Sequence, residues 1–177
     1  MRRDELAARG VQVPVLPTIA LGPLPAGDGW ATRLERIGLD VVSTGAAADT
    51  PATVAAARAE VPHRPLVARG GVPGDLAAAG AAIVEAPAPD GGDIYRFGAG
   101  DRWVAPVSAT DAEVEAVMEV ARRVLDAARR DVPSALWVAA GPGLDALDPD
   151  VVEAKLAVLV EGARQARLYL AKEQFDT

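Results

Sequence analysis

Short apolar runs alternate along the chain with stretches in which apolar residues recur every three or four positions, a pattern typical of buried strands and half-buried helices. We expect strands at residues 11–21, 39–45, 64–71, 81–87 and 135–140. Pro14 and Pro17 indicate that the first of these strands is not regularly paired along its whole length. Residues 94–107 have the pattern of a β-hairpin whose turn is formed by the glycine-rich residues 98–101.

The expected helices lie between these strands and carry recognisable start and stop signals. A helix at 29–38 ends at Gly38, and Thr50 with Pro51 begins a helix that runs to about Glu60. Residues 74–79 are long enough for a short helix only. The T-x-x-E sequence at 110–113 predicts a capping box for a helix that Pro133 ends, and residues 148–149, Asp-Pro, cap the last helix.

Repeated alternation of apolar strands with amphipathic helices predicts a parallel sheet covered by helices, in a single domain that spans residues 1–177. Such a sheet either curls into a barrel or spreads as a doubly wound sheet. A full (β/α) barrel needs about 250 residues and about 200 at its leanest. We therefore expect an α/β fold of the reduced or incomplete TIM-like barrel type, with a doubly wound open parallel sheet as the alternative.

Composition removes several classes of function. The net charge of −7 argues against binding to nucleic acid or to an anionic membrane, because these need clustered Lys and Arg. The chain has no cysteine and one histidine, His63, which excludes disulfides, thiolate metal sites and histidine-rich metal cages. No apolar stretch approaches the roughly 18 residues of a membrane span, so a cytoplasmic protein is expected. Neither G-x-G-x-x-G nor the P-loop sequence is present.

Two segments resemble a known family. Residues 17–25, PTIALGPLP, resemble the first-strand segment PTTTIGSFP of the cobalamin-independent methionine synthase barrel. Residues 136–144, LWVAAGPGL, resemble the closing WVNPDCGL segment of that family, and the helix after them is similar to its final helix. The resemblance implies a TIM-like barrel of the methionine synthase and uroporphyrinogen decarboxylase group, and a role in one-carbon or sulfur-amino-acid metabolism.

The departures from the family pattern concern its chemistry. The family's closing cysteine is a zinc ligand that activates a thiol substrate, and Pro142 stands in its place. Gly141 and Ala139 replace the family's Asp and Asn, and Pro23 replaces a serine expected to contact the substrate. We therefore predict no metal site and no cofactor, and a protein that is metal-independent or catalytically degenerate, so that enzyme activity stays an open question.

Candidate site residues follow from the rule that groups beyond the C-terminal ends of barrel strands face the pocket. These are Thr44, Arg69 and Glu85, with Gly22, Gly141 and Gly143 along the same rim.

Arg69, with the backbone amides of Gly70 and Gly71, could clamp an anion, or it could pair with Glu85 across neighbouring strands. Glu85 could be a general base or could simply balance Arg69. Trp137 could stack on a flat ligand such as a folate or pterin, or could pack in the core.

Two functions remain open. The first is a methionine synthase-like protein that binds a small metabolite at the C-terminal strand ends. The alternative is a non-catalytic descendant of the methionine synthase family. It would bind a metabolite or a protein through the pocket that corresponds to the family's active site or through an open sheet edge. Exposed edges must be paired or covered, which makes a homodimer the expected partner arrangement.

Overall fold

Strands and helices alternate along the chain in the computed structural model, which describes residues 6–85, 95–97 and 102–175. The strands are β1 (Thr18–Ala20), β2 (Val42–Ser43), β3 (Leu66–Arg69), β4 (Ile83–Glu85), β5 (Tyr95–Phe97), β6 (Arg102–Val104) and β7 (Leu136–Ala140). The helices are α2 (Trp30–Ile37), α3 (Pro51–Glu60), α4 (Pro73–Ala78), α5 (Val117–Arg130) and α6 (Pro149–Phe175), with 3₁₀ turns η1 (Pro133–Ala135) and η2 (Leu144–Ala146). None of the helices in these ranges is long and apolar enough to cross a membrane.

All strand pairs in the described ranges are parallel, as predicted for every expected strand outside residues 94–107. They form two sheets, of order β1-β7-β6 and β2-β3-β4-β5. A backbone hydrogen bond of 3.1 Å from Val41 N to Thr18 O joins the segments at the start of β1 and β2. Within the described residues neither sheet closes on itself, so the fold is α/β with open parallel sheets.

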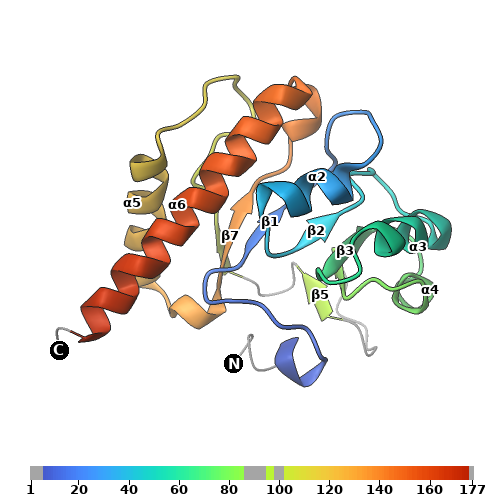
Figure 1. Ribbon diagram of the computed structural model, residues 1–177, viewed down its shortest axis with the longest axis horizontal. Coiled ribbons are helices and arrows are strands. Elements are labelled where there is room, and N and C mark those ends of the chain that lie inside the picture. Colours follow the sequence, from blue (N-terminus) through green and yellow to red (C-terminus); the bar gives the residue numbers. More distant parts are fainter. Residues whose placement is uncertain (1–5, 86–94, 98–101, 176–177) are drawn as a thin grey trace.

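The helices cover the outer faces of both sheets (Figure 1). α5 and α6 lie side by side against β6, β7 and β1, and α6 also packs on α2. α2 contacts α3, and α3 contacts α4 over the second sheet. The helix that follows the last strand, α6, thus packs against α2, the helix that follows the first strand.

The local end signals predicted for three helices are confirmed. Thr50 caps α3, since Thr53 N donates to Thr50 Oγ1 (3.2 Å) and Thr50 N donates to Thr53 Oγ1 (2.9 Å). Gly38 ends α2 in a left-handed conformation. Asp148 accepts a hydrogen bond of 2.9 Å from Asp150 N at the start of α6.

The predicted hairpin at 94–107 is wrong. β5 pairs in parallel with β4, and β6 pairs in parallel with β7, so the two strands belong to different sheets. The physical reason is the pairing of sheet edges. β5 bonds to the backbone groups at the edge of β4, and β6 bonds to those at the edge of β7; a hairpin of β5 and β6 would have left both edges unpaired. The predicted turn residues 98–101 lie outside the described residues.

The predicted capping box at 110–113 is also wrong, because α5 begins later, at Val117. Nearby side chains compete for the backbone groups of this segment: Glu113 N donates to Asp111 Oδ1 (3.1 Å), and Ser108 N donates to Glu115 Oε1 (2.5 Å). The buried ammonium of Lys155 on α6 adds a contact to Glu115 Oε2 at 3.2 Å. These contacts hold residues 108–115 in an irregular, bent segment and keep them out of the helix.

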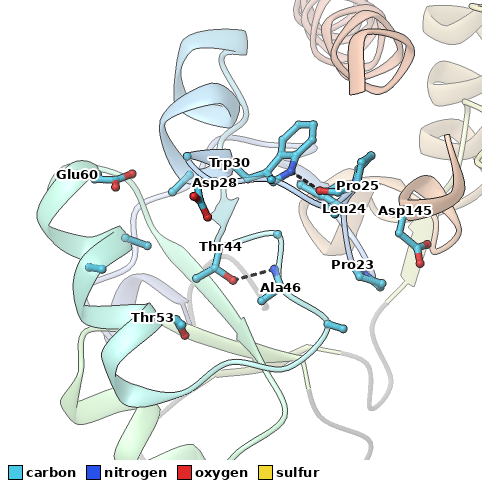
Figure 2. A pocket seen from close by; sticks show the side chains of 18 residues that line it. Pro23, Leu24, Pro25, Asp28, Trp30, Thr44, Ala46, Thr53, Glu60 and Asp145 are labelled. Carbon is cyan, nitrogen blue, oxygen red and sulfur yellow. Dashed lines mark hydrogen bonds between the residues drawn. The ribbon is translucent and has the colours of Figure 1, made fainter. Parts of the chain in front are cut away.

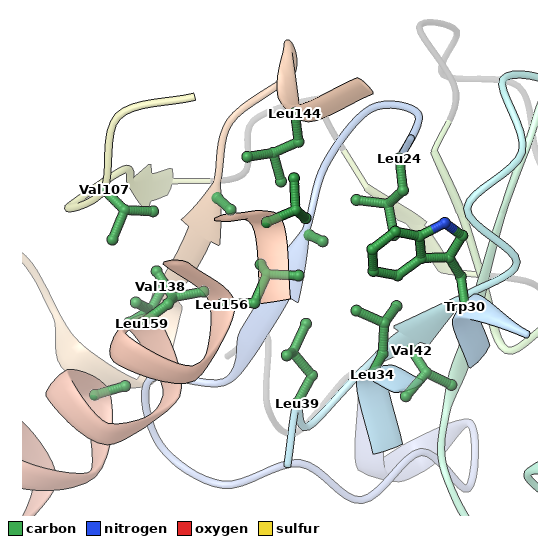
Figure 3. Packing of buried hydrophobic residues seen from close by; sticks show 14 of the residues in the cluster. Leu24, Trp30, Leu34, Leu39, Val42, Val107, Val138, Leu144, Leu156 and Leu159 are labelled. Atoms are coloured by element: carbon green, nitrogen blue, oxygen red, sulfur yellow. The ribbon is translucent and has the colours of Figure 1, made fainter. Parts of the chain in front are cut away.

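The hydrophobic core has two layers, because strand residues alternate between the two faces of each sheet. The outer layer lies between strands and helices and includes Trp30, Leu34, Val42, Val138 and Leu156 (Figure 3). The inner layer joins the opposite faces of the strands and includes Ile19, Val41, Val67, Ile83 and Trp137. Because both faces of the strands are buried, polar and apolar residues do not alternate along them.

Candidate functional site

A groove of about 650 Å³ opens at the C-terminal ends of β1 and β2, and we call it the strand-end groove. Figure 2 shows the side chains that line it, which come from the loop after β1, the start of α2, the loop after β2, one side of α3, and η2. The lining residues are Pro23–Ala31, Thr44–Ala47, Thr53, Ala56, Ala57, Glu60 and Asp145. Its size falls in the range of about 300–1,000 Å³ that is typical of small-molecule sites.

The loop after β1 is held in place by contacts to the loop after β2. Leu24 N donates to Gly45 O (2.9 Å), and the indole of Trp30 donates through Nε1 to Pro25 O (2.8 Å). Gly45 has a φ of 81°, and a Cβ there would lie 2.7 Å from Trp30 Cδ1. Only glycine therefore allows the buried indole to lie against this turn, and the two loops form one rigid wall.

The loop after β2 is fixed by Asp49, which is only 4% exposed. Its Oδ1 accepts hydrogen bonds from Thr44 Oγ1 (2.5 Å) and Thr53 Oγ1 (3.3 Å), and its Oδ2 accepts from Arg69 N (2.7 Å). Asp49 N donates in return to Arg69 O at 2.7 Å. One carboxylate thus joins the end of β3 to the loop and to the first turn of α3.

Arg69 and Glu85 occupy register positions opposite each other at the ends of β3 and β4. Arg69 Nε donates to Glu85 Oε2 (2.7 Å), which is the pairing predicted as one of the two alternatives. The remaining guanidinium nitrogens donate to backbone carbonyls: Nη2 to Ala20 O (3.0 Å) and Nη1 to Ala46 O (3.3 Å). The side chain of Arg69 is 6% exposed and that of Glu85 is 29% exposed. Arg69 does not line the groove, but its hydrogen bond to Ala46 O holds the loop after β2 that does.

The charged side chains that line the groove are all carboxylates among the described residues: Asp28, Glu60 and Asp145. Glu60 Oε2 accepts a hydrogen bond of 3.0 Å from Thr32 Oγ1, which joins α3 to α2 at one end of the groove. Asp145 lies at the opposite side of the groove in Figure 2. The field in this groove favours a ligand that presents amino groups or other hydrogen-bond donors.

The predicted site residues take several different places. Thr44 lines the strand-end groove, and Arg69 and Glu85 lie together beneath its loop. The remaining six do not line it: Gly22 is buried beside Pro142, Gly70 and Gly71 are exposed after β3, Trp137 is buried in the inner core layer, and Gly141 and Gly143 follow β7. Ligand binding by these residues stays a prediction.

Sequence reasoning missed one residue that supports the site and one buried polar residue near it. Asp49, which fixes the groove loop, had one available signal: an acidic residue directly before the helix cap Thr50. Ser43 on β2 is 1% exposed, and its hydroxyl has no hydrogen-bond partner among the described residues. It is the register partner of Val67, whose side chain belongs to the inner layer. Ser43 does not line the strand-end groove.

The residues at the ends of β1 and β7 do not fit a zinc ion. Pro142 offers no donor atom, and the chain has no cysteine to replace the missing ligand. A Cβ on Gly22 would lie 2.9 Å from both Cα and Cβ of Pro142, so backbone and a proline ring fill this space. No three His, Asp or Glu side chains gather as a metal-binding group in the described part of the chain.

Comparison with known proteins agrees with this fold. No protein-family description and no curated protein matches the sequence. A solved structure of a B12-independent methionine synthase from Shewanella sp. W3-18-1, in complex with selenomethionine, matches with a TM-score of 0.73 at 13% sequence identity. The match covers 90% of this chain and 100% of the other. At this identity the likeness is one of fold, so the chain is similar in architecture to that methionine synthase.

Proposed function

We propose that this chain binds a small metabolite in the strand-end groove and that it is a methionine synthase-like protein without zinc-thiol chemistry. The observation that carries the proposal is the position and size of the groove. It lies at the C-terminal ends of β1 and β2, the edge where parallel α/β folds bind their ligands, and it holds about 650 Å³.

We also infer that the two sheets are parts of one incomplete barrel. The first strand, β1, pairs with the last, β7, which is the neighbour relation that barrel closure requires and a doubly wound sheet lacks. The hydrogen bond from Val41 to Thr18 brings the second strand beside the first. The packing of α6 on α2 gives the helices the same ring-like order.

The chemistry of the groove favours binding over methyl transfer. Its described lining contains carboxylates, hydroxyls and apolar walls but no sulfur or imidazole group. Zinc would normally supply the thiolate that such a transfer needs, and the segment around Pro142 has no ligand for it. A folate or pterin fits the proposal, because its amino groups can donate to Asp28, Glu60 or Asp145 while its rings contact the apolar wall.

Calorimetry with methyltetrahydrofolate, homocysteine and methionine tests this proposal. Ala56 lines the groove and Ala59 does not, although both are exposed alanines on α3. We expect at least one compound to bind, Ala56→Trp to weaken that binding by about tenfold or more, and Ala59→Trp to leave it unchanged. Equal loss in both variants, or no binding by any compound, would overturn the assignment. Methionine production from the folate and homocysteine would refute the claim of lost chemistry.

A second candidate is protein binding through a sheet edge. The observation that favours it is Trp103 on β6, whose exposure is 44% although it is an aromatic residue on a strand. Within the described residues β6 has one strand neighbour, β7. The expected homodimer would cover such an edge. Sedimentation equilibrium tests it: a dimer mass that Trp103→Ser converts to a monomer supports the edge, and a stable monomer of the unaltered chain contradicts it.

A further inference from the structure

A second cavity lies at the opposite end of the sheet from the strand-end groove. It holds about 310 Å³ and lies next to the residues that precede β3 and β4, Pro65 and Ala82. We call it the basic cavity, because its charged or titratable lining residues in the described part of the chain are Arg58, His63 and Arg64. No carboxylate among the described residues lines it.

Arg58 supplies a fixed positive charge behind the cavity. Its guanidinium donates to backbone carbonyls: to Gly80 O through Nε (3.1 Å) and Nη2 (2.8 Å), and to Arg64 O (2.7 Å) and Val61 O (3.2 Å) through Nη1. No carboxylate of the described chain pairs with it, and burial lowers the pKa of Arg58. These bonds hold the turn before β3 in place but leave the positive charge uncompensated.

Arg64 and His63 supply the free donors. Arg64 is half-buried, His63 is exposed, and neither side chain has a hydrogen bond or ion pair with a described residue. The turn that Arg58 fixes therefore places a guanidinium beside an imidazole at one cavity, and neither is paired within the described ranges. A guanidinium presents parallel N–H groups that match two oxygens of a phosphate.

We propose that the basic cavity binds a small phosphate-bearing metabolite. Three cationic or titratable groups without a carboxylate partner among the described residues attract anions, even though the chain as a whole carries a net charge of −7. Arg58 contributes its charge, Arg64 donates to the phosphate oxygens, and His63 offers an imidazole N–H donor at the rim. The cavity is at the small end of the range for ligand sites, which restricts the ligand to a compact molecule. This site is separate from the strand-end groove, and its proposal does not depend on that one.

The single histidine makes a direct test practicable, because the imidazole protons of His63 give one resolved set of NMR signals. The probe is inorganic phosphate, added at pH 6.5 and at constant ionic strength with chloride as the balancing anion. We expect a saturable shift of the His63 signals with phosphate and no comparable shift with chloride or acetate. A shift that rises linearly without saturation, or equally with acetate, would overturn the proposal.

Arg64→Gln removes the main donor while it breaks no side-chain hydrogen bond or ion pair with a described residue, so we expect it to fold normally. Loss of one charge-assisted hydrogen bond should weaken phosphate binding by about tenfold. Arg130→Gln is the matched control, because Arg130 is an exposed arginine in the last turn of α5 and does not line the cavity. Equal weakening in both variants would show a general charge effect and no site. Arg64→Lys keeps the charge but loses the parallel N–H groups of the guanidinium. It should bind phosphate with an affinity between those of the unaltered protein and of Arg64→Gln.

Discussion

Arg69→Met tests whether the ends of the strands are held together by a buried guanidinium. The substitution keeps much of the side-chain length but removes the donors to Glu85, Ala20 and Ala46 at once. Breaking one partner of a buried ion pair costs about 3–5 kcal/mol. The Glu85 side chain is 29% exposed, so water can solvate its carboxylate after the change, which places the cost at the low end. We expect a loss of about 3 kcal/mol in the free energy of unfolding.

Urea denaturation measures this loss. With a slope of about 2 kcal/mol per molar urea, 3 kcal/mol lowers the midpoint by about 1.5 M. Arg130→Gln, which removes an exposed arginine, should stay within about 0.5 kcal/mol of the unaltered protein. The double variant Arg69→Met/Glu85→Leu should recover part of the loss, because replacing both partners of a pair leaves no unpaired charge. If Arg69→Met lowered the free energy of unfolding by less than about 1 kcal/mol, no more than Arg130→Gln does, the reasoning would be refuted.

Three further changes follow from local geometry. Gly162→Ala on α6 should lower the free energy of unfolding by about 1–3 kcal/mol in the same urea assay, because a Cβ there would overlap Val120 of α5. Gly74→Ala on α4 is its counterpart: nothing lies within 4 Å of a Cβ at that position, and a gain of about 0.5–1 kcal/mol is expected, so a loss would contradict the open space. Side-chain hydrogen bonds, first from Arg164 and then from Gln165, lower the pKa of Glu161 from 4.5 to about 2. Because this pKa is lowered in the folded state, the pair stabilises the protein above about pH 4.5 and loses that contribution as the pH falls through about 2. Arg164→Gln should return the pKa of Glu161 toward 4.5 in an NMR titration, and an unchanged pKa would show that the arginine is not the cause.

Features that depend on neighbouring residues were predictable from the sequence. The strand and helix alternation, the Thr50 cap, the Gly38 stop and the Asp148 cap all follow from short-range patterns. The pairing of Arg69 with Glu85 was one of two alternatives, since both residues stand at the ends of successive strands. The composition also determined that the chain itself supplies no cysteine thiolate.

Features that depend on distant residues were decided by the tertiary structure alone. The strands at 95–97 and 102–104 belong to different sheets because β4 and β7 present edges to them, and no local signal identifies which edge a short strand will join. The start of α5 depends on acceptors in its own loop and on Lys155, which lies 40 residues further along the chain than Glu115. The strand-end groove likewise exists because Arg69 and Asp49 bind a loop that precedes them in the sequence. Long-range pairing of buried polar groups is set by where the packed elements meet, and a linear pattern of apolar and polar residues does not contain that information.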